Sequence, residues 1–330
     1  MQALVLDTDK KLSIESVPTP QPGPGEVLVK IRAAALNHRD IWIQKGLYPG
    51  IQLPSILGAD GAGEVVKTGP GVEDYWLGKE VVIYPAHGWP QGAPWPDKSF
   101  KVLGMPVDGT LAESLKIEVD HLFPKPEHLS WTEAAALPLA GLTAWRALMS
   151  RASLQSGEKI LITGIGGGVA QLGLILALAS GAEVYVSSSK ADKLEDALQK
   201  GAKAGVNYRE EDWYEQLKTL SGGIDLVMDS SPAEKLDNYL KFLNVGGRVV
   251  YYGATANRMT SFNLSKFFLR QIAVLGSTMG SLEDFKAMLQ FVADHKLIPP
   301  VHQVYPFTAS PTALADLEKG EQCGKLVIEM

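Results

Sequence analysis

The feature that most constrains the fold is a regular alternation of short apolar runs and longer segments between residues 160 and 276. Six apolar runs have the length of strands, and the segments between them have the length and apolar spacing of helices. Strands that alternate with helices are typical of βαβ units, whose strands run parallel. The expected strands are 160–163, 183–186, 205–207, 224–228, 248–252 and 272–275, and the expected helices are 169–180, 191–200, 212–220 and 233–243.

These six strands predict an α/β fold with a doubly wound parallel sheet, an arrangement that binds dinucleotides. The rest of the chain has a different pattern. Residues 1–118 contain short strand-like runs separated by Gly- and Pro-rich turns, which indicates an antiparallel β-rich unit. After the last parallel strand we expect a helix over 282–295 and a final strand over 325–328.

Composition and charge exclude several classes of protein. Of the 330 residues, 45% are hydrophobic and 21% are charged, which excludes intrinsic disorder. The net charge of −6 argues against nucleic acid or an anionic membrane as a partner. No apolar run approaches the roughly 18 residues of a membrane span, and the first residues lack a signal peptide's apolar core. The single cysteine, Cys323, excludes a disulfide framework. We therefore expect a soluble, cytoplasmic protein.

A glycine-rich turn stands between the first expected strand of the parallel sheet and the helix after it. Residues 163–170 read TGIGGGVA. A pyrophosphate needs backbone N–H groups without β-carbons in its way, and the positive end of the following helix then attracts the anion. The sequence therefore predicts a phosphate site whose contacts are Gly164, Gly166, Gly167, Gly168 and Val169.

The end of the second strand predicts which dinucleotide is bound. An NAD site usually carries Asp or Glu about 20 residues after the first glycine, to accept from the ribose 2′-hydroxyl. Here the sequence has three hydroxyl residues and a lysine instead: Ser187, Ser188, Ser189 and Lys193. These groups suit the 2′-phosphate of NADPH. Hydrogen bonds to a charged group are each worth roughly 1.5–3 kcal/mol, so two of them favour NADPH by about two orders of magnitude. The alternative is a solvated Ser-rich loop.

Four motifs occur in a fixed order along the chain: NHRD at 37–40, GLYP at 46–49, LGADGAG at 57–63 and AALPLAGLTA at 135–144. In these motifs the chain resembles the medium-chain dehydrogenases/reductases, over essentially its whole length. It is most similar to the zinc-free quinone oxidoreductase-like branch, including NYR at 207–209. The resemblance implies a GroES-like β-rich catalytic domain from residues 1–125 and 277–330, a Rossmann NADP-binding domain from 126–276, and an active site in the cleft.

The resemblance also implies where a catalytic zinc would lie in zinc-dependent relatives. The positions that match their Cys, His and Cys ligands are Asn37, Ala59 and Leu139. Zinc needs thiolate, imidazole or carboxylate ligands, and neither alanine nor leucine supplies one. The other candidate ligands are scattered along the sequence: His38, His87 and Asp60. We therefore expect no metal site.

Hydride transfer without a metal requires an acceptor that tolerates negative charge, such as a quinone or an α,β-unsaturated carbonyl. By resemblance to residues that line the family's substrate cleft, Asn37 and Tyr48 are the candidate catalytic hydrogen-bond donors. The resemblance implies further cofactor contacts at Thr143, Tyr208, Gly253 and Lys325.

Two alternatives stay open for the activity. One is an alcohol dehydrogenase or aldehyde reductase of the same superfamily, and the other is an NADPH-binding sensor or structural protein without turnover, because a fold alone does not establish activity. For the assembly, the sixth strand of the parallel sheet is an exposed edge that needs covering. The family covers it with a second subunit, so the resemblance implies a homodimer.

Overall fold

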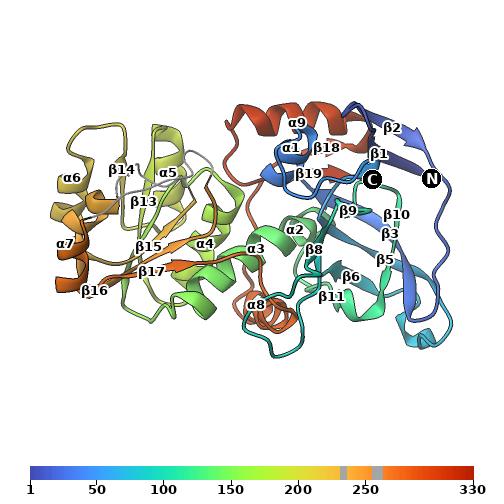
Figure 1. Cartoon of the computed structure of the whole chain (residues 1–330), viewed down its shortest axis with the longest axis horizontal. Helices are drawn as coiled ribbons and strands as arrows, with labels where there is room; N and C mark the ends of the chain where they lie inside the picture. Colours follow the sequence, from blue (N-terminus) through green and yellow to red (C-terminus); the bar gives the residue numbers. More distant parts are fainter. Residues whose placement is uncertain (231–235, 255–262) are drawn as a thin grey trace. The chain divides into compact units, whose positions relative to one another are not determined.

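The computed structural model describes residues 1–230, 236–254 and 263–330, which fall into two compact units (Figure 1). The first unit combines Met1–Ala140 with Ser281–Met330, and the second is Gly141–Gly280. Both ends of the chain therefore contribute to the first unit. The predicted domain boundaries lie at 125 and 276, and residues 126–140 cluster with the first unit.

The second unit contains a six-stranded parallel sheet in the order β14-β13-β12-β15-β16-β17. In chain order this is 3-2-1-4-5-6, the strand order of a dinucleotide-binding Rossmann fold. The predicted α/β fold is therefore confirmed. The strands are β12 (Lys159–Ile162), β13 (Glu183–Ser188), β14 (Ala204–Asn207), β15 (Ile224–Asp229), β16 (Leu243–Tyr251) and β17 (Ala273–Gly276).

Helices connect these strands, as the sequence predicts. In the middle strand β12, Ile160, Leu161 and Ile162 have no exposed surface, as expected for a parallel sheet covered on both faces. The described helices of the unit are α4 (Gly168–Ala179), α5 (Ala191–Gln199), α6 (Trp213–Ser221), α7 (Leu264–Leu269), the 3₁₀ helix η4 (Leu236–Lys241) and the π-helix η3 (Arg146–Arg151), which continues α3 (Pro138–Trp145).

One predicted helix of this unit is wrong over its described part. The sequence predicts a helix over 233–243, of which 233–235 lie outside the described residues. Residues Leu236–Lys241 form the 3₁₀ helix η4, and Leu243 already begins β16. Leu236 and Tyr239 are both buried and three residues apart, the spacing at which side chains of a 3₁₀ helix point the same way.

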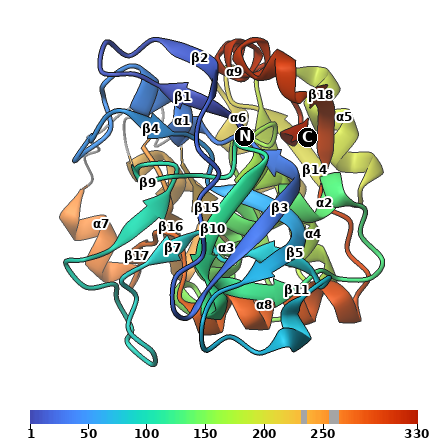
Figure 2. The same ribbon diagram turned by 90° about the vertical axis from the view of Figure 1, so that its right-hand side faces the viewer.

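The first unit is mainly antiparallel sheet, as the GroES-like assignment requires. Figure 2 faces this unit and shows its strands β3, β5 and β10. The strands are β1 (Gln2–Leu6), β2 (Leu12–Ser16), β3 (Glu26–Ala35), β4 (Ser55–Ile56), β5 (Asp60–Thr68), β6 (Glu80–Ile83), β7 (Ala86–His87), β8 (Lys101–Leu103), β9 (Pro106–Val107), β10 (Ser114–Glu118), β11 (Leu122–Pro124), β18 (Val301–Pro306) and β19 (Lys325–Glu329).

Seven of these strands form one sheet, with β3 at its centre. The order is β11-β6-β5-β3-β19-β18, and β10 also pairs with β3. The short sheets β2-β1-β4 and β7-β8-β9 complete the unit. Its helices are α1 (His38–Gln44), α2 (Trp131–Ala136), α8 (Leu282–Asp294), α9 (Ser310–Lys319) and the 3₁₀ helices η1 (Asp74–Trp76), η2 (Val119–His121) and η5 (Phe307–Ala309). Within the described ranges, the helices are all too short or too polar to span a bilayer.

Candidate active site

Three polar residues that are distant in sequence meet at one end of the strands β3, β5 and β19. Asp60 opens β5 opposite Ala35, the last residue of β3. Asn37 follows the end of β3 by two residues and precedes helix α1. Lys325 opens β19, which pairs with the same end of β3. The register of the sheet therefore brings the side chains of Asn37, Asp60 and Lys325 together.

The Lys325 ammonium has three oxygen partners in this cluster. Its Nζ donates to the Leu36 carbonyl at 2.7 Å, to Oδ1 of Asn37 at 2.6 Å and to Oδ2 of Asp60 at 2.9 Å. Three bonds use all the donors of an ammonium group. Lys325 is 3% exposed and Asp60 has no exposed surface, so this is a buried ion pair whose hydrogen bonds offset the cost of desolvation.

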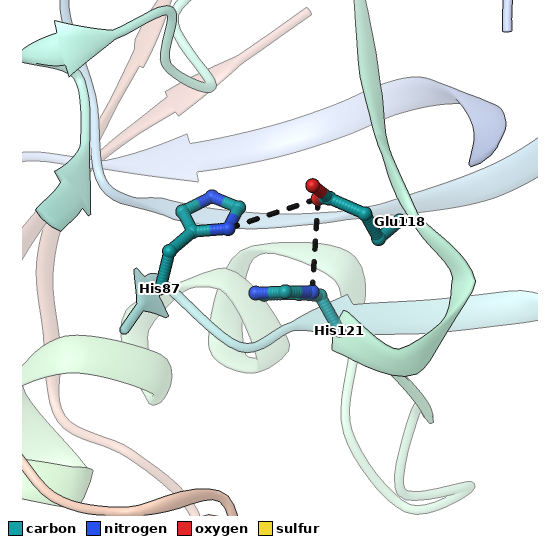
Figure 3. A group of neighbouring side chains, drawn as sticks. All are labelled: His87, Glu118 and His121. Atoms are coloured by element: carbon teal, nitrogen blue, oxygen red, sulfur yellow. Dashed lines mark ion pairs between the residues drawn. The ribbon is translucent and has the colours of Figure 1, made fainter. Parts of the chain in front are cut away.

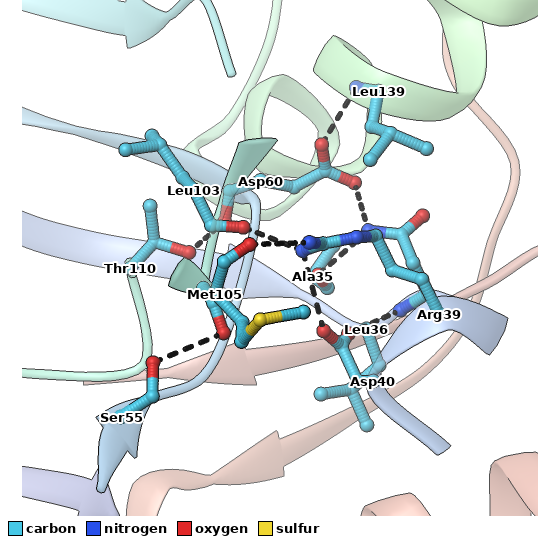
Figure 4. Close-up of polar contacts among 12 residues, drawn as sticks. Ala35, Leu36, Arg39, Asp40, Ser55, Asp60, Leu103, Met105, Thr110 and Leu139 are labelled. Atoms are coloured by element: carbon cyan, nitrogen blue, oxygen red, sulfur yellow. Dashed lines mark hydrogen bonds and ion pairs between the residues drawn. The ribbon is translucent and has the colours of Figure 1, made fainter. Parts of the chain in front are cut away.

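The Asp60 carboxylate also receives hydrogen bonds from two further groups. Asn37 Nδ2 donates to Oδ2 at 2.9 Å. The backbone N–H of Leu139 donates to Oδ1 at 2.6 Å (Figure 4). Leu139 lies in the first turn of α3, where unpaired N–H groups favour an anion. Both oxygens of the Asp60 carboxylate therefore accept hydrogen bonds from the protein, and the Lys325 ammonium balances its charge.

A second buried ion pair supports the start of α1. Oδ2 of Asp40 accepts from the backbone N–H of Asn37 at 2.9 Å. Oδ1 of Asp40 has no hydrogen-bond partner among the described residues, and the Arg39 guanidinium lies 4.0 Å from it. Arg39 instead donates to the carbonyls of Leu103 and Met105 (Figure 4). Burial raises the pKa of Asp40, against the opposing effect of Arg39.

The residues at the family's catalytic-zinc positions do not fit a zinc ion. Ala59 is fully buried and offers only a methyl group. Leu139 contributes a backbone donor, and Asn37 contributes an amide oxygen that accepts from Lys325. The positive charge next to the Asn37 oxygen is the Lys325 ammonium. Zinc, by contrast, is bound by thiolate, imidazole or carboxylate groups. No step through a catalytic metal follows from this donor set.

The two predicted catalytic residues have different surroundings. Both polar atoms of Asn37 are engaged, Nδ2 with Asp60 and Oδ1 with Lys325, and the residue is buried. Tyr48 is half-buried, and the Arg39 guanidinium lies 5.1 Å from the centre of its ring. Within the described part of the chain, the Tyr48 hydroxyl has no hydrogen-bond partner. Of the two, Tyr48 is therefore the residue with a donor available to a ligand.

Lys325 is predicted by the resemblance to contact the cofactor. In the structure its three donors are bonded to protein oxygens of the first unit. Its contact with a cofactor stays a prediction. Its charge also acts on His38, the first residue of α1. Desolvation lowers the pKa of His38, and the Lys325 charge lowers it further.

In the second unit, the predicted glycine turn joins β12 to α4. Gly164 has φ +60°, a backbone conformation that favours glycine. The backbone N–H of Ile165 donates to the Ser187 carbonyl at 3.1 Å, which ties the turn to β13. Gly167 is the N-cap of α4, and the first N–H groups of the helix, from Gly168 and Val169 onward, have no partner within the helix. The turn therefore fits a phosphate group.

The predicted 2′-phosphate residues lie beside this turn. The side chain of Lys193, in the first turn of α5, passes so close to Gly166 that a β-carbon there would meet its Nζ at 2.6 Å. Ser187 and Ser188 end β13, and both are buried. Lys193 thus lies beside the glycine turn and two hydroxyl residues end β13, and the first turn of α5 also carries the acidic residue Asp192.

The remaining predicted cofactor contacts follow the carboxyl ends of the parallel strands. Ser188 pairs with Asn207, so Ser189 and Tyr208 follow neighbouring strand ends. Gly253 follows β16, and a β-carbon on it would lie 3.1 Å from the side chain of Ser230, after β15. Ligands of open α/β sheets bind at this edge. Thr143 is buried within α3. The roles of these residues stay predictions.

Sequence reasoning missed one further group of potential ligands. His87 was considered with His38 and Asp60, but in the structure it lies beside Glu118 and His121 instead. The spacing of Glu118 and His121, three residues apart, was the available signal.

Comparisons with known proteins agree with this architecture. A family model described as "Zinc-binding dehydrogenase" matches residues 168–294, and one described as "Alcohol dehydrogenase GroES-like domain" matches residues 23–127. Among named relatives, the zinc-type alcohol dehydrogenase-like protein YogA of Leptosphaeria maculans is 35% identical, with 97% of this chain and 94% of that protein covered. The acryloyl-coenzyme A reductase of Metallosphaera sedula is 30% identical, with 97% and 95% covered.

A solved structure is equally similar. The crystal structure of an NAD-dependent alcohol dehydrogenase has a TM-score of 0.94 and 36% identity, with 100% of both chains covered. The chain belongs to the medium-chain dehydrogenase/reductase superfamily, among the zinc-type alcohol dehydrogenase-like proteins. It is accordingly an oxidoreductase of the NAD(P)-dependent type.

Proposed function

We propose that this chain is an NADPH-dependent reductase that transfers a hydride to a quinone or an α,β-unsaturated carbonyl without a catalytic metal. The observation that carries the proposal is the contact of Lys325 with Asn37 and Asp60. Asn37 and Leu139, which match zinc-ligand positions of zinc-dependent relatives, contact an internal ion pair in this chain. Polarisation of the acceptor therefore rests on hydrogen-bond donors.

The chemistry needs one donor for the oxygen of the acceptor. When bound, NADPH supplies the hydride, which adds to the carbon conjugated with the carbonyl. Negative charge then develops on the enolate or hydroquinone oxygen. The Tyr48 hydroxyl is the donor we assign to this oxygen, because no described residue uses it. Asn37 hydrogen-bonds both Lys325 and Asp60 and so positions them. A direct contact of Asn37 with the acceptor is also part of the proposal.

The preference for NADPH rests on Lys193, Ser187 and Ser188. A 2′-phosphate is a dianion, which a carboxylate at the end of β13 would repel and an ammonium attracts. The 2′-hydroxyl of NADH is uncharged and gains no comparable attraction from the Lys193 ammonium. We assign the 2′-phosphate to the side chain of Lys193 and the serine hydroxyls.

The names of relatives support a conjugated acceptor. The acryloyl-coenzyme A reductase of Metallosphaera sedula carries a conjugated thioester in its name. A second candidate function is alcohol dehydrogenase or aldehyde reductase activity, which the solved NAD-dependent alcohol dehydrogenase at 36% identity favours.

A substrate panel separates these functions. Purified protein is given NADPH or NADH with a quinone, an enal or a saturated aldehyde, and nicotinamide absorbance is followed. The proposal expects NADPH consumption with the quinone or the enal and little with the saturated aldehyde. Consumption with the saturated aldehyde alone would favour the alcohol dehydrogenase reading. Cofactor binding without turnover across the panel would favour a sensor or structural protein.

A further inference from the structure

Two histidines and a glutamate of the first unit converge away from the Asp60 cluster. His87 ends β7, Glu118 ends β10 and His121 ends the short helix η2, and their side chains point toward one another (Figure 3). Oε2 of Glu118 lies 3.7 Å from Nδ1 of His87 and 3.8 Å from Nδ1 of His121. One potential ligand atom from each residue lies within 4.8 Å of the other two.

The hydrogen bond of His121 leaves a lone pair on its Nδ1, on the side where the three side chains converge. Its Nε2 lies 2.9 Å from the Ala86 carbonyl, which only accepts, so Nε2 carries the proton. In the neutral ring, Nδ1 is then an unprotonated acceptor. This Nδ1 is buried and has no hydrogen-bond partner within the described residues. A buried acceptor without a donor costs free energy that a bound cation would recover.

The distances from Glu118 to the two histidine nitrogens fit a cation bound between the side chains better than direct hydrogen bonds. A hydrogen bond between nitrogen and oxygen is about 2.7–3.2 Å long, shorter than both Glu118 distances. Two ligands that are each about 2.0–2.1 Å from a tetrahedral ion lie about 3.4 Å apart, so small side-chain movements suffice. The rings of His87 and His121 are 4.3 Å apart at their centres, which places two nitrogen ligands on one ion within reach.

The surroundings match those of histidine ligands in metal proteins. A metal-bound imidazole commonly donates its other N–H to a carbonyl, as His121 does to Ala86. Desolvation lowers the pKa of His121 and that of His87, so both rings favour the neutral form that binds metals. Glu118 is 53% exposed, which leaves a route for an ion and for water ligands.

We propose that His87, Glu118 and His121 form a binding site for a divalent transition-metal ion, for which Zn²⁺ is the fitting probe. Two imidazoles and one carboxylate are ligands that zinc accepts, with water completing the coordination. The bound ion joins β7, which precedes the connection 88–100, to β10 and η2. The site does not include Asn37, Asp60 or Lys325, so it stands independently of the proposed reaction.

The test measures metal binding directly. Protein freed of metal with a chelator is titrated with Zn²⁺ by calorimetry, and with Co²⁺ by visible absorption. We expect one Zn²⁺ per chain and a Co²⁺ spectrum that indicates nitrogen and oxygen ligands. Glu118→Gln and His87→Gln should each weaken binding by about tenfold or more. His302→Gln and Cys323→Ser, which change other potential ligands, should leave the affinity unchanged.

The variants need a check of their folding, because the ring of His87 packs against that of His121. Glu118→Gln changes an exposed carboxylate, so its circular dichroism and thermal unfolding in chelator should match those of the unchanged protein. Zn²⁺ should raise the melting temperature of the unchanged protein and not that of Glu118→Gln. The proposal is overturned if stoichiometric binding is absent, or if it persists equally in Glu118→Gln and His87→Gln.

Discussion

The ammonium of Lys325 lies 2.9 Å from Oδ2 of Asp60, and the two residues are 265 positions apart in the chain. The contact joins the last strand of the protein to the fifth, at the end of β3, the strand with which both pair. Asn37 and Leu139, which the resemblance matches to zinc-ligand positions of zinc-dependent relatives, both donate to this Asp60 carboxylate. The stability of the first unit and the chemistry proposed for it therefore depend on the same ion pair.

Breaking this ion pair from one side should destabilise the protein strongly. We expect Lys325→Met to lower the unfolding free energy by about 3–5 kcal/mol, because Asp60 stays buried without its cation. The double variant Asp60→Asn/Lys325→Met should lose less than the sum of the two single changes. Urea unfolding followed by tryptophan fluorescence measures this. Lys45→Met, which removes an exposed pair with Glu318, is the matched control and should have a small effect. Strict additivity of the two buried changes would contradict the account.

Removal of the Lys193 charge should reduce the preference for NADPH. Lys193→Ala is expected to raise the Michaelis constant for NADPH by about tenfold or more, since a charge-assisted hydrogen bond is worth roughly 1.5–3 kcal/mol. The Michaelis constant for NADH should change little. Adding Ser188→Asp should further narrow the difference between the constants for NADPH and NADH. Initial rates with both cofactors measure the effect. Lys203→Ala, an exposed lysine before β14, is the control. An unchanged NADPH constant would mean that the 2′-phosphate lies elsewhere.

Loss of the Tyr48 hydroxyl should slow turnover. We expect Tyr48→Phe to lower kcat by about 10²-fold, the effect of removing a donor to a developing oxyanion, with little change in NADPH affinity. Steady-state rates and cofactor titration separate the two quantities. Tyr75→Phe, at a tyrosine that is 63% exposed, is the comparison. If Tyr48→Phe keeps the full rate, Tyr48 is not the donor.

Stability should fall in mild acid partly because of His38. Its pKa lies below the ordinary value of 6.5 in the folded protein. As pH falls below 6.5, the unfolded chain takes up a proton that folded His38 does not, so its contribution to stability is present above this pH and is lost below it. His38→Gln should therefore make the unfolding free energy less dependent on pH in this range. Identical pH profiles, or an NMR titration midpoint of His38 above 6.5, would refute this.

The edge strand β17 should mediate a dimer. It pairs with β16 on one side, its other side is the edge of the sheet among the described strands, and its Val274 is 43% exposed. We propose that a second copy covers this edge, and we expect Val274→Lys to convert a dimer to a monomer in light scattering. Val304→Lys, at a similarly exposed valine of β18, should leave the dimer intact. A monomeric unchanged protein would exclude the proposal.

Much of the second unit follows from sequence patterns because its determinants are local. All six predicted strands of the parallel sheet are found. Five lie within a few residues of their predicted positions, and the sixth, β16, begins five residues early at Leu243. The glycine turn and Lys193 are also adjacent in space, as their places after β12 and β13 predict. The error at η4 arises because apolar residues alone do not distinguish an α-helix from a tighter turn.

The first unit was less predictable because its sites depend on strand register. Nothing local to Lys325 shows that it is buried against Asp60, since the contact needs β19 and β5 to flank β3. Likewise, His87 meets Glu118 and His121 only through the folding of short strands and a 3₁₀ turn. Charged residues at strand ends are usually solvated. The sequence alone therefore does not predict the contact of Lys325 with Asp60 or that of His87 with Glu118 and His121.

The most direct test of the central claim follows the transferred hydrogen in metal-free protein. Glu118→Gln protein, which lacks the proposed separate metal site, is treated with chelator until it holds no measurable zinc. It then receives an enal and NADPH deuterated at the transferable position of the nicotinamide. The account predicts deuterium on the β-carbon of the product, at a rate that added zinc does not change. Deuterium on the carbonyl carbon, or activity that appears only when zinc is restored, would contradict it.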